Sequence, residues 1–66
     1  MDDSNIRNRE IIIEYRPEGR YMRVSALDAV SLTEIVIQGP VNASKELLER
    51  NALKRLEYVM KKKGLL

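Results

Sequence analysis

The feature that most constrains the fold is a change of hydrophobic period at Gly39-Pro40. Before this dipeptide, apolar residues recur at every second position, as do Met22, Val24 and Ala26, which is typical of half-buried strands. After it, apolar residues recur at helical spacing: Leu48, Ala52, Leu56, Val59 and Met60. The pattern predicts an α+β fold, in which a three-stranded antiparallel meander is followed by one long C-terminal helix packed on one sheet face.

Three strands are expected, over residues 9–16, 21–27 and 32–38. Pro17 and Gly19 indicate a first turn, and Asp28, which can bind its own backbone, indicates a second. Each turn is expected to take about four residues. Period 2 places nine side chains on the inner face of the sheet: Ile11, Ile13, Tyr15, Met22, Val24, Ala26, Thr33, Ile35 and Ile37.

The helix is expected to begin near Asn42 or Ser44, since either residue can cap it, and to end at Gly64. A glycine at this position allows Leu65 to fold back onto Met60. The helix is expected to cover the inner sheet face with its apolar stripe: Leu48, Ala52, Leu53, Leu56, Val59 and Met60.

The chain has 66 residues, which predicts a single domain over 9–66 after a flexible N-terminal arm over 1–8. A domain of this size buries little apolar surface and usually needs a disulfide, a metal or a second subunit. The chain contains no cysteine and no histidine, so disulfides and the commonest zinc ligands are excluded. We therefore expect a homodimer and no cofactor.

The outer face of the predicted sheet is the first candidate site. With four-residue turns, Arg23 would lie opposite Glu14 and near Glu34. Two interpretations stay open: a solvated face with scattered apolar residues, or a contiguous patch that binds a second copy or another protein. Tyr58 and Leu47 lie on one side of the helix and are either partly buried or a second contact line. The candidate interface comprises Ile12, Tyr21, Arg23, Leu27, Leu32, Val36 and Tyr58.

Basic residues form the second candidate site: Arg50, Lys54, Arg55, Lys61, Lys62 and Lys63. They favour nucleic-acid binding as the alternative function. A meander followed by a helix also resembles the second half of a double-stranded RNA-binding domain, but here Glu46 and Glu49 follow Lys45 at the helix start. Ion pairs of Glu46 with Arg50 and of Glu57 with Lys61 would explain part of the basic set without a ligand.

We do not expect an enzyme, because the sequence has no histidine or cysteine, no glycine-rich phosphate loop and no carboxylate cluster. The longest apolar runs, among them Ile11-Ile12-Ile13, are far shorter than the ~20 residues of a membrane span. The N-terminus is acidic and polar, unlike a secretory signal. A cytoplasmic protein without membrane contact is expected.

Three segments carry a resemblance to a known family: residues 24–28, with the sequence Val-Ser-Ala-Leu-Asp, residues 33–40 and residues 52–59. Over 9–63 the chain resembles a family of short alphaproteobacterial proteins of unknown function. The resemblance implies a bacterial origin and no activity. A glycine is common in the second turn of that family, where this chain has Leu32, and leucine is unfavourable in a left-handed conformation.

Overall fold

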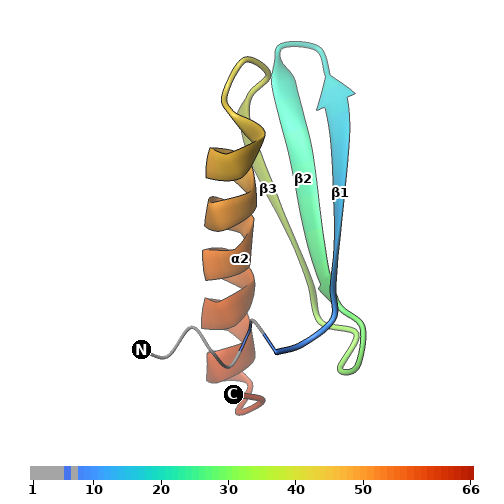
Figure 1. The fold of residues 1–66 in the computed structure, drawn as a ribbon, viewed down its shortest axis with the longest axis vertical. Helices are drawn as coiled ribbons and strands as arrows, with labels where there is room; N and C mark the ends of the chain where they lie inside the picture. The colour runs from blue at the N-terminus through green and yellow to red at the C-terminus, as the bar shows by residue number, and fades with distance from the viewer. Residues whose placement is uncertain (1–5, 7) are drawn as a thin grey trace.

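The computed structural model describes Ile6 and residues 8–66, and it has the predicted order of three strands and a helix (Figure 1). The strands are β1 (Ile11–Glu18), β2 (Tyr21–Asp28) and β3 (Glu34–Pro40), and the helix is α2 (Lys45–Lys62). The strands form an antiparallel sheet in the order β1-β2-β3. The helix packs on one face of the sheet, against β2 and β3, and the α+β prediction is confirmed.

The first hairpin is tighter than predicted. Glu18 pairs with Tyr21, so only Gly19 and Arg20 lie between the strands, and Gly19 has a φ of 63°. Pro17, which was expected in the turn, is inside β1 and pairs with Met22. β1 is an edge strand, where proline is tolerated because its missing N–H need not bond a neighbour. The four-residue turn was therefore wrong, and the pairing of β1 with β2 shifts by two residues.

The second turn is longer than predicted, because β3 begins at Glu34 and ends at Pro40, where a strand over 32–38 was expected. This turn depends on a left-handed leucine. Leu32 has a φ of 62°, which in other turns usually requires glycine. Its amide donates to the carbonyl of Asp28 over 2.7 Å, and the Asp28 amide donates to the carbonyl of Thr33 over 2.8 Å. The Asp28 carboxylate also accepts from the Ser31 amide over 2.8 Å, as the sequence predicted for a residue that binds its own backbone. Hydrogen bonds on both sides of Leu32 hold it in this conformation.

Both ends of α2 have defined caps. The Ser44 hydroxyl accepts from the Leu47 amide over 3.1 Å, so Ser44, and not Asn42, is the N-cap. At the other end Gly64 has a φ of 76°, its amide donates to the Lys61 carbonyl, and the Leu65 amide donates to the Met60 carbonyl over 2.8 Å. These two bonds form a Schellman motif.

The core lies between the inner sheet face and α2, as predicted. Its fully or nearly buried members are Ile6, Val24, Ala26, Ile35, Leu48, Ala52, Leu56 and Met60. Leu66 packs against this cluster, whereas Leu65 is 40% exposed, and its expected side-chain contact with Met60 stays a prediction.

Most of the predicted arm, residues 1–8, lies outside the described residues. Ile6, which the structure does describe, is buried in the core. Within the described part of the chain, no helix is long and apolar enough to cross a membrane.

Candidate functional site

The outer face of the sheet is opposite the face that α2 covers, and it carries most of the candidate interface (Figure 1). Period 2 and the strand register arrange its side chains in four rows across the sheet. Ile12, Tyr21 and Val36 are exposed to 44%, 56% and 42%, and Leu27 is half-buried. The rows, from the end near the second turn, are Ile12–Leu27–Glu34, Glu14–Ser25–Val36, Arg16–Arg23–Gln38 and Glu18–Tyr21–Pro40.

The register corrects the predicted charge pairing. Arg23 lies opposite Arg16 and Gln38, and Glu14 lies opposite Ser25. Because the hairpin turn is two residues shorter than expected, Glu14 and Arg23 are not cross-strand partners. Like charges that face each other across strands are destabilising. The two arginines therefore raise the free energy of the isolated sheet slightly.

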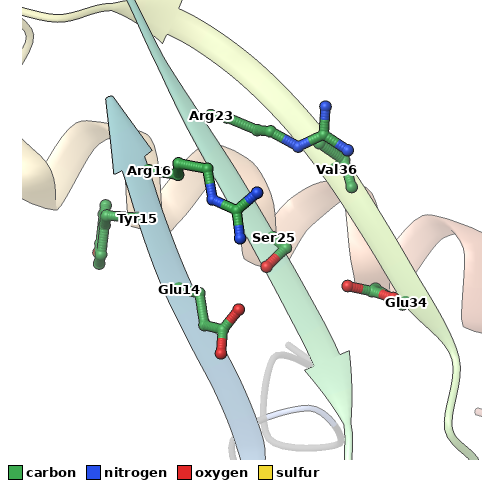
Figure 2. A pocket seen from close by; sticks show the side chains of 7 residues that line it. All are labelled: Glu14, Tyr15, Arg16, Arg23, Ser25, Glu34 and Val36. Carbon is green, nitrogen blue, oxygen red and sulfur yellow. The ribbon is translucent and has the colours of Figure 1, made fainter. Parts of the chain in front are cut away.

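Figure 2 shows how these charges are distributed. Arg16 and Arg23 lie toward one end of the view, with the Arg16 guanidinium over β2 and the Arg23 guanidinium over β3, while Glu14 and Glu34 lie toward the other end. Among the residues that the structure describes, none forms an ion pair with Glu14, Arg16, Arg23 or Glu34. They surround an open depression of about 510 Å³, which is lined by Glu14, Tyr15, Arg16, Arg23, Ser25, Glu34 and Val36.

Next to this face, the second turn is fixed by an ion pair that the sequence analysis missed. Arg9 donates from Nε and Nη2 to the two carboxylate oxygens of Asp28, over 3.0 and 3.1 Å. The Asp28 side chain is fully buried and also accepts from the Ser31 hydroxyl over 2.6 Å. The Arg9 guanidinium and these Ser31 bonds hold the pKa of Asp28 well below its usual range, although burial opposes the shift. The same ion pair raises the pKa of Arg9.

This rigid turn presents Leu32, another predicted interface residue, to solvent. Leu32 is 70% exposed, and Val30 beside it is 78% exposed. A left-handed conformation costs a leucine roughly 1–2 kcal/mol, and an exposed side chain recovers little of that cost within the monomer. The sequence carried a signal for this strain, because the resemblance described above implies a glycine at the position of Leu32.

The basic residues of α2 are partly engaged by their neighbours. The Lys61 ammonium lies 3.5 Å from the Glu57 carboxylate, which confirms one of the two predicted helical ion pairs. Arg55 and Lys62 each lie 5.5 Å from the centre of the Tyr58 ring. Tyr58 itself is exposed and is on a different side of the molecule from the outer sheet face, because α2 covers the inner face. The structure thus separates Tyr58 from the other candidate interface residues.

Tyr15 on the inner face makes polar contacts with α2. The Tyr15 hydroxyl donates to the Glu49 carboxylate over 3.3 Å, and the Lys45 ammonium lies 5.0 Å from the Tyr15 ring. Burial and the nearby Glu49 charge raise the pKa of Tyr15. This contact connects β1 to the first turns of α2.

Within the part of the chain that the structure describes, no three His, Cys, Asp or Glu residues gather as metal ligands would. The outer face thus combines exposed apolar side chains with separated positive and negative charges.

A family model, Domain of unknown function (DUF6898), matches residues 8–63. The chain belongs to this family. The match contains all three strands and α2, and with them the outer sheet face. Comparison with curated proteins and with solved structures finds no match. The family is uncharacterised, as the resemblance implied, and the bacterial origin stays a prediction.

Proposed function

We propose that this chain is a non-enzymatic protein-interaction domain that forms a homodimer through the outer face of its sheet. The observation that carries the proposal is the combination, on a face opposite the helix, of exposed Ile12, Tyr21 and Val36 with the facing pair Arg16 and Arg23. Packing against a second sheet would remove the apolar groups from water and give the arginines acidic partners.

The area of the outer face limits how much surface the dimer can bury. Strands of eight residues are about 26 Å long, and three strands are about 14 Å wide. A face of this size covers about 360 Å² per copy, less than half of the roughly 800 Å² per partner of a standard interface, so the association should be weak and reversible. We therefore expect dissociation in the micromolar range.

The test is sedimentation velocity over a dilution series from about 1 to 100 µM. We expect a monomer–dimer equilibrium that Val36→Lys shifts to monomer, because a lysine there would bring a charge into the apolar part of the interface. Leu47→Lys is the matched control, since Leu47 is 43% exposed against 42% for Val36 but lies on α2. A wild-type chain that stays monomeric throughout, or a Val36→Lys variant that dimerises as well as Leu47→Lys, would overturn the proposal.

Nucleic-acid binding by α2 is the second candidate function. It is favoured by the exposed Tyr58 ring, which Arg55 and Lys62 flank, because aromatic and cationic groups on one surface suit stacked bases and phosphates. We expect weak binding of a labelled single-stranded oligonucleotide that disappears between 50 and 200 mM salt, as roughly expected for phosphate contacts. Lys62→Glu should abolish it, whereas equal binding by this variant and the wild type would rule out the site.

A further inference from the structure

When two such sheets stack with their strands aligned, the rows of the outer face are self-complementary in only one of the two symmetric arrangements. A homodimer with aligned strands has a two-fold axis in the plane between the sheets, either along the strands or across them. The two axes bring different residues together, because one exchanges β1 with β3 and the other reverses the order of the rows.

An axis along the strands places β2 over β2 of the second copy. Each row then faces the same row, so Arg23 faces Arg23 at the axis, and Arg16 faces Gln38. This arrangement sets two guanidinium groups against each other in an interface that excludes water, which is unfavourable. It also leaves Glu14 facing Val36.

An axis across the strands, between the row of Glu14 and the row of Arg16, reverses the order of the rows. Each strand then lies antiparallel over its own counterpart, and Glu14 of each copy faces Arg16 of the other. Arg23 faces Ser25 and Tyr21 faces Leu27, while Val36 faces Gln38 and Ile12 faces Glu18. Of the four charged residues labelled in Figure 2, Glu14 and Arg16 are the two that this second operation brings face to face.

We infer that the homodimer uses the axis across the strands, with two equivalent contacts between Glu14 of one copy and Arg16 of the other. The inference rests on the proposed function, because it specifies the arrangement of that same face. It also accounts for the Arg16–Arg23 pair, since the Glu14 carboxylate of the second copy supplies the negative charge that the row lacks.

Charge reversal tests this arrangement. Arg16→Glu gives a face with glutamate at both positions, and Glu14→Arg gives a face with arginine at both, so each variant alone should dimerise at least about tenfold more weakly than the wild type. An equimolar mixture restores both contacts in a heterodimer, because each glutamate then faces an arginine. The double variant Glu14→Arg/Arg16→Glu should restore the homodimer.

Loss of folding does not explain the expected effect of Arg16→Glu. The new glutamate faces Arg23 across the strands, so the variant exchanges a like-charge pair for an opposite-charge pair within the sheet. Circular dichroism should show an intact fold. Lys54→Glu, on exposed α2, changes the net charge by the same amount and should leave dimerisation unchanged.

The readout is native mass spectrometry of the wild type, each variant and the mixture, with one variant isotopically labelled so that the heterodimer has its own mass. A mixture that forms the heterodimer in preference to either homodimer supports the inference. A wild-type dimer whose variants show no such preference overturns the arrangement and leaves the proposed function standing. A monomeric wild type overturns both.

Discussion

Replacing Asp28 by asparagine tests the strongest local interaction that the structure shows. The substitution keeps the shape of the side chain but removes the charge that accepts from Arg9 and Ser31. Removing one partner of a buried ion pair commonly lowers the free energy of unfolding by about 3–5 kcal/mol. The loss should be at the lower end of this range here, because the Arg9 side chain is 25% exposed and can be hydrated when Asp28 no longer carries a charge. We expect a loss of about 3 kcal/mol. A 66-residue domain has roughly 3–10 kcal/mol of stability, so the variant should be close to unfolding.

The assay is urea unfolding followed by circular dichroism, with Glu18→Gln as the control because Glu18 is an exposed carboxylate of the same sheet. With a slope of about 1 kcal/mol per molar urea, the midpoint should fall by about 3 M. The pKa of Asp28 is lowered in the folded state, so its stabilisation is complete above the unfolded pKa of about 4 and is lost as the pH falls below it. The wild type should lose this stability on acidification and the variant should not. An Asp28→Asn midpoint equal to that of Glu18→Gln would refute the reasoning.

Two further substitutions probe backbone positions. Leu32→Gly should raise the free energy of unfolding of the monomer by about 0.5–1 kcal/mol. The substitution removes the strain of a left-handed leucine, and this gain exceeds the conformational entropy that glycine adds to the unfolded chain. A lower melting temperature for the variant would contradict this. Gly39→Ala should cost about 1–2 kcal/mol in the same thermal assay, because a Cβ there would lie 2.5 Å from Cδ2 of the buried Leu48. Gly64→Ala is its comparison, since a Cβ at Gly64 meets no atom and should act only through its positive φ.

The sequence was sufficient for the architecture because hydrophobic period and capping chemistry are local. The change of period at Gly39-Pro40 predicted the sheet and the helix, and Ser44 and Gly64 fixed the two helix ends. The predicted assignment of side chains to the inner sheet face was correct even though the predicted length of the first turn was wrong. The pairing of β1 with β2 shifted by two residues, an even number, so every side chain stayed on its predicted face while its cross-strand neighbour changed.

The candidate site was less predictable because it depends on register and on contacts between distant residues. Pro17 and Gly19 are both typical of turns, and only pairing shows that Pro17 belongs to an edge strand. The hydrogen bonds between Arg9 and Asp28 join residues 19 positions apart. The hydrophobic pattern of a sequence does not predict a contact between such distant polar residues. The facing arginines, which now carry the dimer arrangement, followed only from the observed two-residue loop.

The most direct measurement of the central claim is a pair of amide NMR spectra, at about 10 µM and at about 1 mM, which bracket the expected micromolar equilibrium. If the outer sheet face binds a second copy, resonances of Ser25 and Val36 shift with concentration while those of Lys54 on α2 do not. Spectra that superimpose over the whole chain at both concentrations, or shifts confined to α2, would contradict the claim.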